Sequence, residues 1–444
     1  MIRRLFIANR GEIALRVIRT AKAMGITTVL GVSSADAASL PALMADETVL
    51  LGPGPSSQSY LSIDKVVAAM VAANCDAVHP GYGFLSENAV FARAVAGEGI
   101  RFVGPDIKTL EGMGDKLAAR ALALEAGLPV LPGGDAATRA AVHARAEEIG
   151  YPLLLKAVAG GGGKGMRRVD RAEDLDIVLD MAQAEAQAAF GNSAVYVERF
   201  VAKGRHVEVQ LLGDGSSAIH LGTRDCSIQR RFQKLVEEAP APAMPEPARA
   251  GIEDAAVRLA RHIGYRGAGT AEFLVDATDF SFYFLELNAR IQVEHPVTEA
   301  ITGVDLVEQQ LLVAAGKRLT LTQAMVRPVG HAIEVRINAE DPEADFRPAP
   351  GRITRAAWPA GPGIRVDTHI AAGGEVPPFY DSLLGKLIVH APSREEAVAR
   401  LQAALRCICI EGVPTTAGLH ARIAADPRFA AGGVDTGFLT GLAQ

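Results

Sequence analysis

Long hydrophobic runs, cysteines and an excess of one charge are all scarce in this sequence. No stretch approaches the roughly 20 consecutive apolar residues that cross a membrane, and the opening MIRRLFIANRGE is too short in apolar residues for a secretory signal. Only four cysteines occur in 444 residues, with no CxxC pair and no zinc-like spacing to histidines. These absences argue against a structural zinc site and suit a reducing compartment. We therefore expect a soluble, cytoplasmic protein without a membrane partner.

The charge balance argues against nucleic-acid binding. The chain has 45 basic and 51 acidic residues, a formal net charge of −6, which disfavours broad electrostatic attachment to a phosphate backbone. A local basic site for a small anion remains compatible with it. The content of 49% hydrophobic and 22% charged residues is that of a globular protein, and the length predicts roughly three domains.

The first 110 residues or so alternate between strand and helix patterns. RLFIA (4–8) is an apolar run, and Ile13, Val17, Ile18 and Ala21 follow at helical spacing. Further strands are expected at 27–34, 76–79 and 101–104. This β-α-β-α order predicts an open parallel sheet.

The rest of the chain mixes strands and helices in two further regions. In the middle region we expect strands at 151–159, 196–201, 206–213, 270–276 and 280–294, with a helix at 249–262. After about residue 325, four strand-like segments precede an amphipathic helix at 394–406.

A glycine cluster at 160–165 (GGGGKG) follows one expected strand and precedes another. A dinucleotide fingerprint would open a helix here, and a P-loop would continue with Lys-Ser or Lys-Thr, so both readings fail. Two alternatives remain, a mobile surface turn or a flap whose backbone N–H groups close over phosphates. Lys156 and Lys164 add positive charge, and the ordering entropy of four consecutive glycines favours the flap.

Polar and apolar residues alternate without exception from Glu286 to Glu294 (ELNARIQVE). In an extended chain one face would carry the polar side chains of residues 286, 288, 290, 292 and 294. A hairpin near Asp279 would place Glu272 opposite Glu286, where two carboxylates and the Asn288 oxygen suit Mg²⁺ or Mn²⁺. The alternative is a solvated outer face, but the flanking segments TAEFLVD and FSFYFL are strongly apolar, so we favour a metal–phosphate site.

Other segments leave their interpretation open. The stretch 224–234 (RDCSIQRRFQK) is either a solvated basic loop or an anion site. The loop 79–87 follows an expected parallel strand, at the edge where open α/β sheets bind ligands. Lys116 alone would be read as a surface lysine at a helix start, and Arg336 as part of an ion pair on a strand face.

Taken together, these segments resemble biotin carboxylase, a family of ATP-grasp enzymes. The resemblance covers nearly the whole chain in the family's order, through the motifs IANRGEIALR, HPGYGFLSEN, MGDK, KAVAGGGGKGM, RDCSIQRR, QVEHPVTE, RINAED and YDSLLGKLIV. It implies an α/β and α+β fold with an N-terminal open α/β (Rossmann-like) domain at 1–113. An ATP-grasp domain would follow at 114–325, with a mobile lid at about 131–203, and a β-rich closing domain at 326–444.

The resemblance also implies roles for individual residues. MgATP would activate bicarbonate as carboxyphosphate, which would carboxylate biotin on a carrier protein. ATP would contact Lys116, Lys156, Gly161, Gly162, Gly163, Glu198, His206, Gln229, Glu272 and Glu286. Mg²⁺ or Mn²⁺ would be held by Glu272, Glu286 and Asn288, and bicarbonate by Lys234, Arg290, Gln292, Val293 and Glu294. Glu294 would act as the general base, with Lys234, Arg290 and Arg336 as further catalytic groups, and biotin would contact Tyr82 and Arg336.

Two positions depart from the family pattern. Phe232 stands where the family usually has a histidine near the nucleotide, and Ala289 where it usually has threonine. We expect altered ATP affinity from Phe232. Ala289 should point away from the polar face, so its effect should be milder.

The resemblance also implies partners. With no Met-Lys-Met biotinylation sequence and no room for a carboxyltransferase, we expect a separate homodimeric subunit that works with a biotin carboxyl carrier protein and a carboxyltransferase. The default complex is acetyl-CoA carboxylase of fatty acid biosynthesis, although propionyl-CoA or another acyl-CoA, pyruvate or urea remain possible acceptors. The alternatives are another ATP-grasp carboxylate–amine ligase, or a catalytically idle regulatory paralogue.

Overall fold

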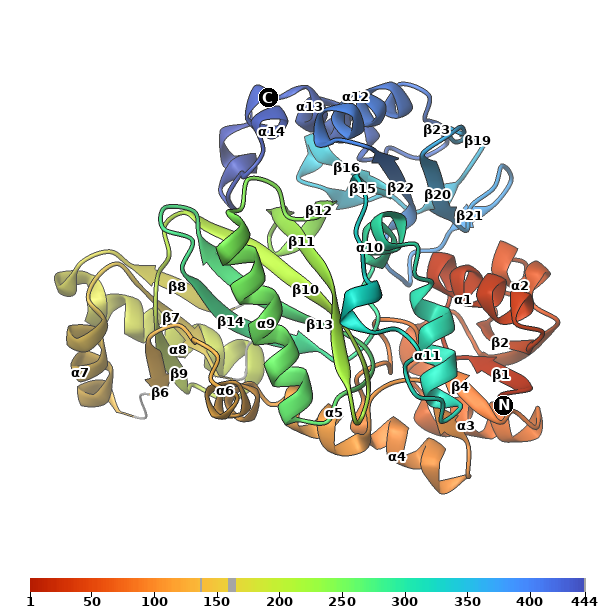
Figure 1. The fold of residues 1–444 in the computed structure, drawn as a ribbon, viewed down its shortest axis with the longest axis horizontal. Coiled ribbons are helices and arrows are strands. Elements are labelled where there is room, and N and C mark those ends of the chain that lie inside the picture. The colour runs from red at the N-terminus through yellow and green to blue at the C-terminus, as the bar shows by residue number, and fades with distance from the viewer. Residues whose placement is uncertain (136–137, 159–164, 443–444) are drawn as a thin grey trace.

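The computed structural model describes residues 1–135, 138–158 and 165–442, and its chain forms three sheet-centred units (Figure 1). The first unit holds a five-stranded parallel sheet in the order β3-β2-β1-β4-β5. Its strands are β1 (Arg4–Ile7), β2 (Thr27–Ser33), β3 (Glu47–Gly52), β4 (Ala77–His79) and β5 (Arg101–Phe102), and its helices are α1 (Gly11–Ala23), α2 (Leu40–Met44), α3 (Ile63–Ala72) and α4 (Ala89–Gly97). The open parallel sheet predicted from the alternating pattern is therefore confirmed.

The topology of this sheet places two loops side by side. From β1 the chain runs outward through β2 and β3, then returns to the other side of β1 for β4 and β5. The carboxyl ends of β1 and β4 thus form the switch point where open α/β sheets bind ligands. The side-chain amide of Asn9, after β1, donates to the carbonyls of Pro80 (2.6 Å) and Tyr82 (2.8 Å), after β4.

The largest sheet has eight strands in the order β14-β13-β10-β11-β12-β15-β22-β20. Its pairings are antiparallel throughout. The strands are β10 (Gly204–Asp214), β11 (Ala218–Arg230), β12 (Gln233–Ala239), β13 (Arg266–Asp276), β14 (Phe282–Asn288), β15 (His331–Asn338), β20 (Ile364–Thr368) and β22 (Leu383–Ala391). β14 lies before the expected boundary near residue 325 and β15 lies after it. Both strands belong to this one sheet, so the sheet continues across the expected boundary. The stretch 224–234, for which the sequence allows both a solvated loop and an anion site, forms the tip half of the β11–β12 hairpin.

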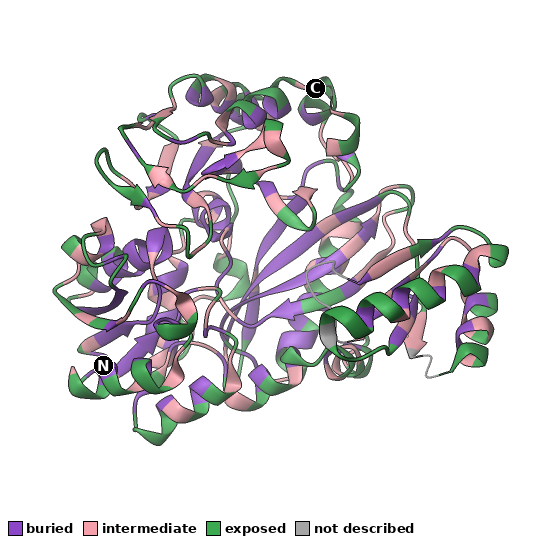
Figure 2. Cartoon of the chain, turned by 180° about the vertical axis from the view of Figure 1, so that it is seen from behind, coloured by how far each residue is buried: buried purple, intermediate pink, exposed green. Residues whose placement is uncertain are grey.

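Helices cover this sheet at both ends. α9 (Glu246–His262) lies across β10, β11 and β13 (Figure 1), and its Ile252, Ala256 and Leu259 belong to the core cluster that contains Val209 and Phe273. At the C-terminal end, α12 (Arg394–Leu405) and α13 (Ala417–Ala425) share a second core with β15 and β22. Figure 2 shows the buried residues running along the central strands of the large sheet.

A separate small unit projects from one end of the molecule (Figure 1). Its four-stranded sheet has the order β6-β9-β7-β8 and its own apolar core. The elements are β6 (Gly133–Asp135), α7 (Arg139–Ile149), β7 (Leu153–Ala157), β8 (Met166–Val169), α8 (Leu175–Phe190) and β9 (Val195–Arg199). β7 and β8 pair antiparallel, so the glycine cluster joins two strands as predicted, although Gly160–Lys164 lie outside the described residues.

The remaining helices and strands include connecting helices and the short elements of the C-terminal region. They are α5 (Ile107–Gly114), α6 (Lys116–Glu125), α10 (His295–Thr302), α11 (Leu306–Ala314), β16 (Glu340–Asp341), β17 (Arg347–Pro348), β18 (Gly351–Arg352), β19 (Arg355–Ala357), β21 (Glu375–Val376), β23 (Cys409–Glu411) and α14 (Pro427–Ala431). All four cysteines are free thiols. Across the described ranges, the longest apolar helices fall short of what a bilayer crossing requires.

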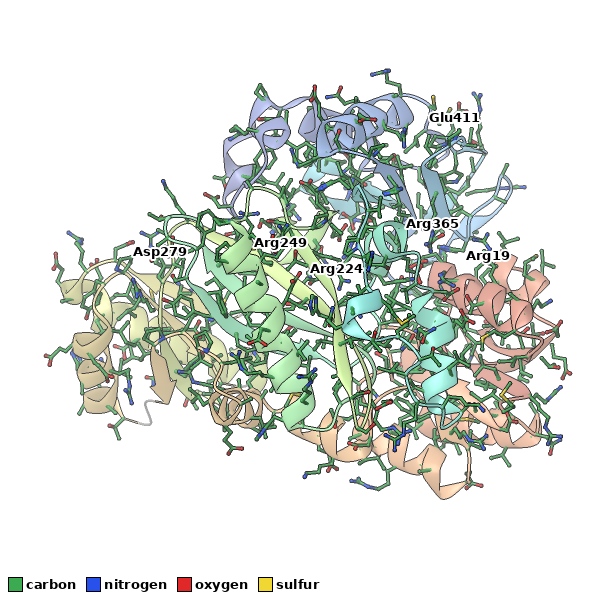
Figure 3. All side chains as sticks on the ribbon, viewed as in Figure 1. Arg19, Arg224, Arg249, Asp279, Arg365 and Glu411 are labelled. Carbon is green, nitrogen blue, oxygen red and sulfur yellow. The ribbon has the colours of Figure 1, made fainter. Side chains whose placement is uncertain are left out.

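Buried charge joins the first unit to the large sheet. The carboxylate of Glu299 on α10 pairs with Arg16 of α1 (2.7 Å) and with Arg365 of β20 (2.8 Å). Figure 3 shows Arg365 where the C-terminal region approaches α1, and Arg224 in the middle of the large sheet. These contacts place the switch-point loops of the first unit against the large sheet.

Candidate functional site

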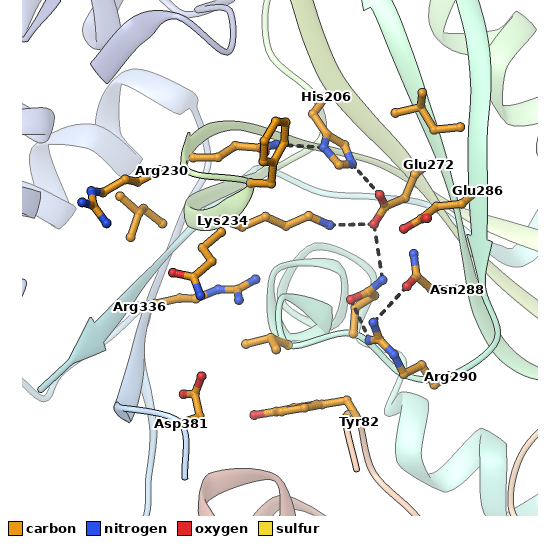
Figure 4. Close-up of a pocket in the computed structure, with 18 of the residues that line it drawn as sticks. Tyr82, His206, Arg230, Lys234, Glu272, Glu286, Asn288, Arg290, Arg336 and Asp381 are labelled. Carbon is orange, nitrogen blue, oxygen red and sulfur yellow. Dashed lines mark hydrogen bonds and ion pairs between the residues drawn. The ribbon is translucent and has the colours of Figure 1, made fainter. Parts of the chain in front are cut away.

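One cavity of about 770 Å³ lies where the three units meet. The first unit supplies its switch-point loops, the small unit supplies β7 and β9, and the large sheet supplies a further wall. Figure 4 shows the side chains of the large-sheet wall. Of the residues predicted from the sequence, fourteen line it: Tyr82, Lys116, Lys156, Glu198, His206, Gln229, Lys234, Glu272, Glu286, Asn288, Arg290, Gln292, Val293 and Arg336. Glu294 is fully buried behind this wall, and Gly161, Gly162 and Gly163 lie outside the described residues.

The carboxylate pair predicted on the hairpin is present. Glu272 of β13 pairs in register with Glu286 of β14, as Figure 4 shows. Burial alone would raise the pKa of Glu272, but the charges of Lys234 (2.8 Å) and His206 (2.9 Å) hold it well below its ordinary value. Glu286 has no hydrogen bond or ion pair within the described ranges, and removal from water and then the charge of Glu272 raise its pKa.

This pair fits a divalent cation. Glu286 lines the cavity, and burial and the charge of Glu272 raise its pKa although His206 and Lys234 partly oppose this. The Asn288 amide lines the wall two residues along the strand. Carboxylate and amide oxygens are the hard ligands of Mg²⁺ and Mn²⁺. Glu272, Glu286 and Asn288 would hold such an ion, which would neutralise phosphate charge next to the cavity.

The predicted strand 280–294 was too long. β14 ends at Asn288, and residues 289–294 form an irregular turn into α10. The polar side chains nevertheless converge, because Arg290 donates to the side-chain oxygens of Asn288 (2.9 Å) and Gln292 (2.9 Å). The period-two pattern therefore identified the right residues, although the extended strand that it assumed ends at residue 288.

Lys234 on β12 is the central cation of the wall. Its ammonium lies within 2.6–2.8 Å of carboxylate oxygens on Glu208, Glu272 and Glu294. Burial opposes the charged form, but these three carboxylates raise the pKa of Lys234 well above its ordinary value. Glu208 is itself fixed from the far side by Arg224 at 2.5 Å. Arg224 and Lys234 are therefore held by buried carboxylates, and within the stretch 224–234 only residues 231–233 at the hairpin tip are exposed.

Glu294 sits between two cations. Its carboxylate lies 2.7 Å from Lys234 and 2.9 Å from Arg336. Burial alone would raise the pKa of Glu294, but these neighbours hold it well below its usual range. Glu237 of β12 shares Arg336 with it, at 2.5 Å, and burial raises the pKa of Glu237 to about 7.

A second group of predicted residues lies toward the small unit. Lys156 of β7 forms an ion pair with Glu198 of β9. The Gln229 amide contacts Nδ1 of His206 at 2.8 Å, which connects this group to the carboxylate pair. Lys116 begins α6, whose first turn is capped by the Asp115 carboxylate. The residues near the small unit and the carboxylate pair thus line the same cavity.

Tyr82 lies across the cavity from the carboxylate wall (Figure 4). Its hydroxyl donates to the buried carboxylate of Glu12 at the start of α1. Burial and this neighbouring carboxylate raise the pKa of Tyr82 well above its ordinary value, so the side chain faces the site as a neutral phenol.

Sequence reasoning missed several charged residues around the site, among them Glu12, Glu208, Glu237 and Lys386. A signal existed for Glu208, because His206, Glu208 and Gln210 alternate with apolar residues along β10. Lys386 stands inside the apolar run of β22 and is completely buried. A lysine in such a place requires a partner.

Comparisons with known proteins agree along the chain. Residues 1–110 match the biotin carboxylase N-terminal domain, residues 115–322 the ATP-binding domain of the carbamoyl-phosphate synthase L chain, and residues 334–441 the biotin carboxylase C-terminal domain. The biotin carboxylase of Nostoc sp. is 50% identical over 439 residues, 98% of each chain.

Solved structures agree as well. A biotin carboxylase from Campylobacter jejuni superposes with a TM-score of 0.95 at 44% identity over 99% of both chains. The biotin carboxylase domain dimer of the Hydrogenobacter thermophilus 2-oxoglutarate carboxylase, described as a complex with MgADP, ADP and bicarbonate, gives 0.94 at 45% identity over 99% of this chain and 97% of that one. The expected ATP-grasp fold is confirmed, and the chain belongs to the biotin carboxylase family.

Proposed function

We propose that this enzyme uses ATP and bicarbonate to carboxylate biotin carried on a biotin carboxyl carrier protein, through carboxyphosphate. The observation that carries the proposal is the placement of Glu294, a buried carboxylate between Lys234 and Arg336, directly beside the wall that bears Glu272 and Glu286. The two cations can hold a small oxyanion next to the metal–phosphate wall, and Glu294 is the carboxylate placed to take its proton as it attacks a phosphate.

Nucleotide binding occupies the side toward the small unit. Lys116, Lys156, Glu198, His206 and Gln229 would contact ATP, together with Gly161, Gly162 and Gly163 of the glycine cluster. A divalent ion on Glu272, Glu286 and Asn288 supplies charge neutralisation for the phosphates when bound. Lys234, 2.8 Å from Glu272, would carry part of the same role.

The wall formed by the large sheet and the segment after β14 would bind bicarbonate. Lys234, Arg290, Gln292 and the backbone of Val293 would hold the anion, and Glu294 would take its proton. The resulting carbonate oxygen bonds to the γ-phosphorus as ADP leaves. Carboxyphosphate then cleaves to CO₂ and phosphate, and the phosphate takes the N1′ proton of biotin. Arg336 stabilises the biotin enolate that attacks CO₂, with Tyr82 lining the biotin side.

The assembly and the domain division belong to the same proposal. We divide the chain into 1–113, 114–325 with a lid at about 131–203, and 326–444; the separate core of the small unit supports such a lid. The protein would act in the cytoplasm as a homodimer with a carrier protein and a carboxyltransferase. Acetyl-CoA carboxylase is the default complex, and the carboxyltransferase sets the acceptor.

Phosphate release tests this function. The purified protein receives MgATP and bicarbonate with and without free biotin, as wild type, as Glu294→Gln and as the exposed control Glu395→Gln. We expect biotin-stimulated release in wild type and control, and a loss of about 10²- to 10⁴-fold in Glu294→Gln with nucleotide binding intact. Release that depends on an amine acceptor and not on biotin would indicate another ATP-grasp ligase. ATP binding without turnover under any combination would indicate a regulatory paralogue.

A further inference from the structure

The segment 289–294 carries the residues assigned to bicarbonate, yet it has no regular structure of its own. It follows the last residue of β14 and precedes the first residue of α10. Backbone groups in such a segment need partners from elsewhere, and those partners fix its position. The first unit of the fold supplies the partner at one end, and the large sheet supplies the partner at the other.

Glu87 holds the first end. It lies in the loop between β4 and α4, and its two carboxylate oxygens accept from the backbone N–H of Ala289 (2.9 Å) and from Nε of Arg290 (2.7 Å). Arg290 also donates through its other nitrogens to Asn288 and Gln292. A guanidinium has five N–H donors in a fixed fork, so the Glu87 contact determines which edge of Arg290 turns to the cavity.

Lys386 holds the other end. Its ammonium donates to the carbonyl of Val293 (2.8 Å) and pairs with Glu12 of α1 at 3.0 Å. Both side chains are within 1% of full burial. The Val293 carbonyl belongs to the peptide that leads into Glu294, so this contact sets the direction in which the proposed base emerges.

One loop of the first unit reaches both anchors. Residues 80–88 contain Glu87 and also Tyr82, whose hydroxyl donates to Glu12. A shift of this loop therefore acts on Ala289 and Arg290 through Glu87, and on Val293 through Glu12 and Lys386. The loop 80–88 thus contacts both the biotin side of the cavity, through Tyr82, and the bicarbonate segment, through Glu87.

We propose that Glu87 and the Glu12–Lys386 pair are positioning residues that fix the bicarbonate segment 289–294 at its two ends. The inference rests on the proposed function, because it assigns bicarbonate to this segment. It predicts a selective effect: loss of either anchor impairs the use of bicarbonate and leaves nucleotide binding intact, because Lys116, Lys156 and Gln229 lie on α6, β7 and β11 and not on the segment that the anchors hold.

The test measures the KM for bicarbonate, the KM for ATP and kcat of biotin-dependent phosphate release in wild type, Glu87→Gln and Lys386→Met. Glu98→Gln, an exposed change at the end of α4, is the matched control. We expect the bicarbonate KM of Glu87→Gln to rise about five- to tenfold, with the ATP KM within about twofold of wild type and an unchanged melting temperature. Lys386→Met should raise the bicarbonate KM and also lower kcat, since it releases the peptide next to Glu294.

The outcomes separate the two proposals. An active wild type whose bicarbonate KM is unaffected by Glu87→Gln overturns this inference alone. An equal rise in both KM values together with a lower melting temperature also overturns it, because it indicates a merely structural role. A wild type without biotin-dependent release overturns the proposed function and this inference with it. Should Lys386→Met fail to fold, the partly exposed Glu87 still decides the question.

Discussion

The ammonium of Lys234 lies 2.7 Å from a carboxylate oxygen of Glu294. In this arrangement the proposed base is paired with a cation, and its pKa lies well below the usual range. Such a carboxylate accepts a proton poorly. An anion that enters the site and draws Lys234 toward itself would weaken this pair, so bicarbonate binding would itself raise the basicity of Glu294.

Lys234→Met should therefore move the pH dependence of the reaction. Among the charges that lower the pKa of Glu294, Lys234 contributes most, so its removal raises that pKa. A base must be deprotonated to act, so the acid limb of the pH–rate profile shifts to higher pH. We also expect kcat/KM for bicarbonate to fall about 100-fold or more. Phosphate release measured across a pH series checks both effects.

The exposed Lys317→Met is the control for this change. It should reproduce the wild-type profile. A Lys234→Met enzyme that keeps the wild-type acid limb, at any level of activity, would contradict the assignment of Glu294 as the base. Its melting temperature should be recorded as well, because three buried carboxylates lose their shared cation.

Glu286→Gln should weaken divalent metal binding. The residue faces Glu272 across the hairpin and forms no direct ion pair among the described residues, so its carboxylate oxygens are available to an ion. We expect Mn²⁺ affinity in the presence of ADP to fall about 10- to 100-fold, read by electron paramagnetic resonance of free Mn²⁺. Chelation of the metal should stop phosphate release, and added Mg²⁺ or Mn²⁺ should restore it. Glu375→Gln, an exposed change, should bind Mn²⁺ as wild type does; equal affinity in Glu286→Gln would rule out the hairpin site.

Asp46→Asn should lower stability in a pH-dependent way. Asp46 accepts from the backbone N–H of Thr28 (2.9 Å), pairs with Lys22 (2.9 Å), and has a pKa lowered to about 2, with the Thr28 backbone as the main cause. A carboxyl group with a lowered pKa stabilises the fold at pH values above its ordinary pKa of 3.8. This stabilisation is lost as the pH falls toward 2. Because the side chain is 39% exposed, we expect a loss of about 1 kcal/mol at neutral pH.

Urea denaturation read at its first transition measures this loss. The difference from wild type should shrink at about pH 3.5. The exposed Asp64→Asn should show no difference at either pH. A loss that is the same at both pH values would mean that the charge of Asp46 is irrelevant to its contribution.

The sequence predicted most where a pattern is local. The run at β1 and the helical spacing of α1 indicated the parallel sheet, because burial of a strand and of one helix face leaves a period in the chain. The Glu272–Glu286 pairing followed from a hairpin near Asp279 and from the period-two alternation that begins at Glu286. These features need only neighbouring residues to be recognised.

The contacts that hold the site together were not predictable in this way. Lys386 stands among apolar neighbours in β22, and Glu12 reads as an ordinary acidic residue in the first turn of a helix. Their ion pair joins positions that are distant in the sequence, so no local period carries it. The end of β14 at Asn288 was missed for a related reason, since the turn at 289–294 depends on Glu87 and Lys386 from other parts of the fold.

Phe232→His should lower the KM for ATP. Phe232 lies at the tip of the β11–β12 hairpin, lines the cavity and is 57% exposed. A phenyl ring there offers a ligand no hydrogen bond, whereas an imidazole can donate or accept one. The backbone φ of 65° at this position is also more readily adopted by histidine than by phenylalanine. One added hydrogen bond predicts a KM about two- to tenfold lower, with kcat little changed.

Steady-state kinetics at varied ATP measure this change, and Phe232→Leu separates hydrogen bonding from ring removal. The leucine variant should keep the KM of wild type or raise it, because it adds no donor. Ala289, the other departure from the family pattern, packs against Ala92 and Leu110 away from this tip, so Ala289→Thr should leave the ATP KM unchanged. If histidine and leucine at position 232 give the same KM and turnover as phenylalanine, the hairpin tip does not contact the nucleotide.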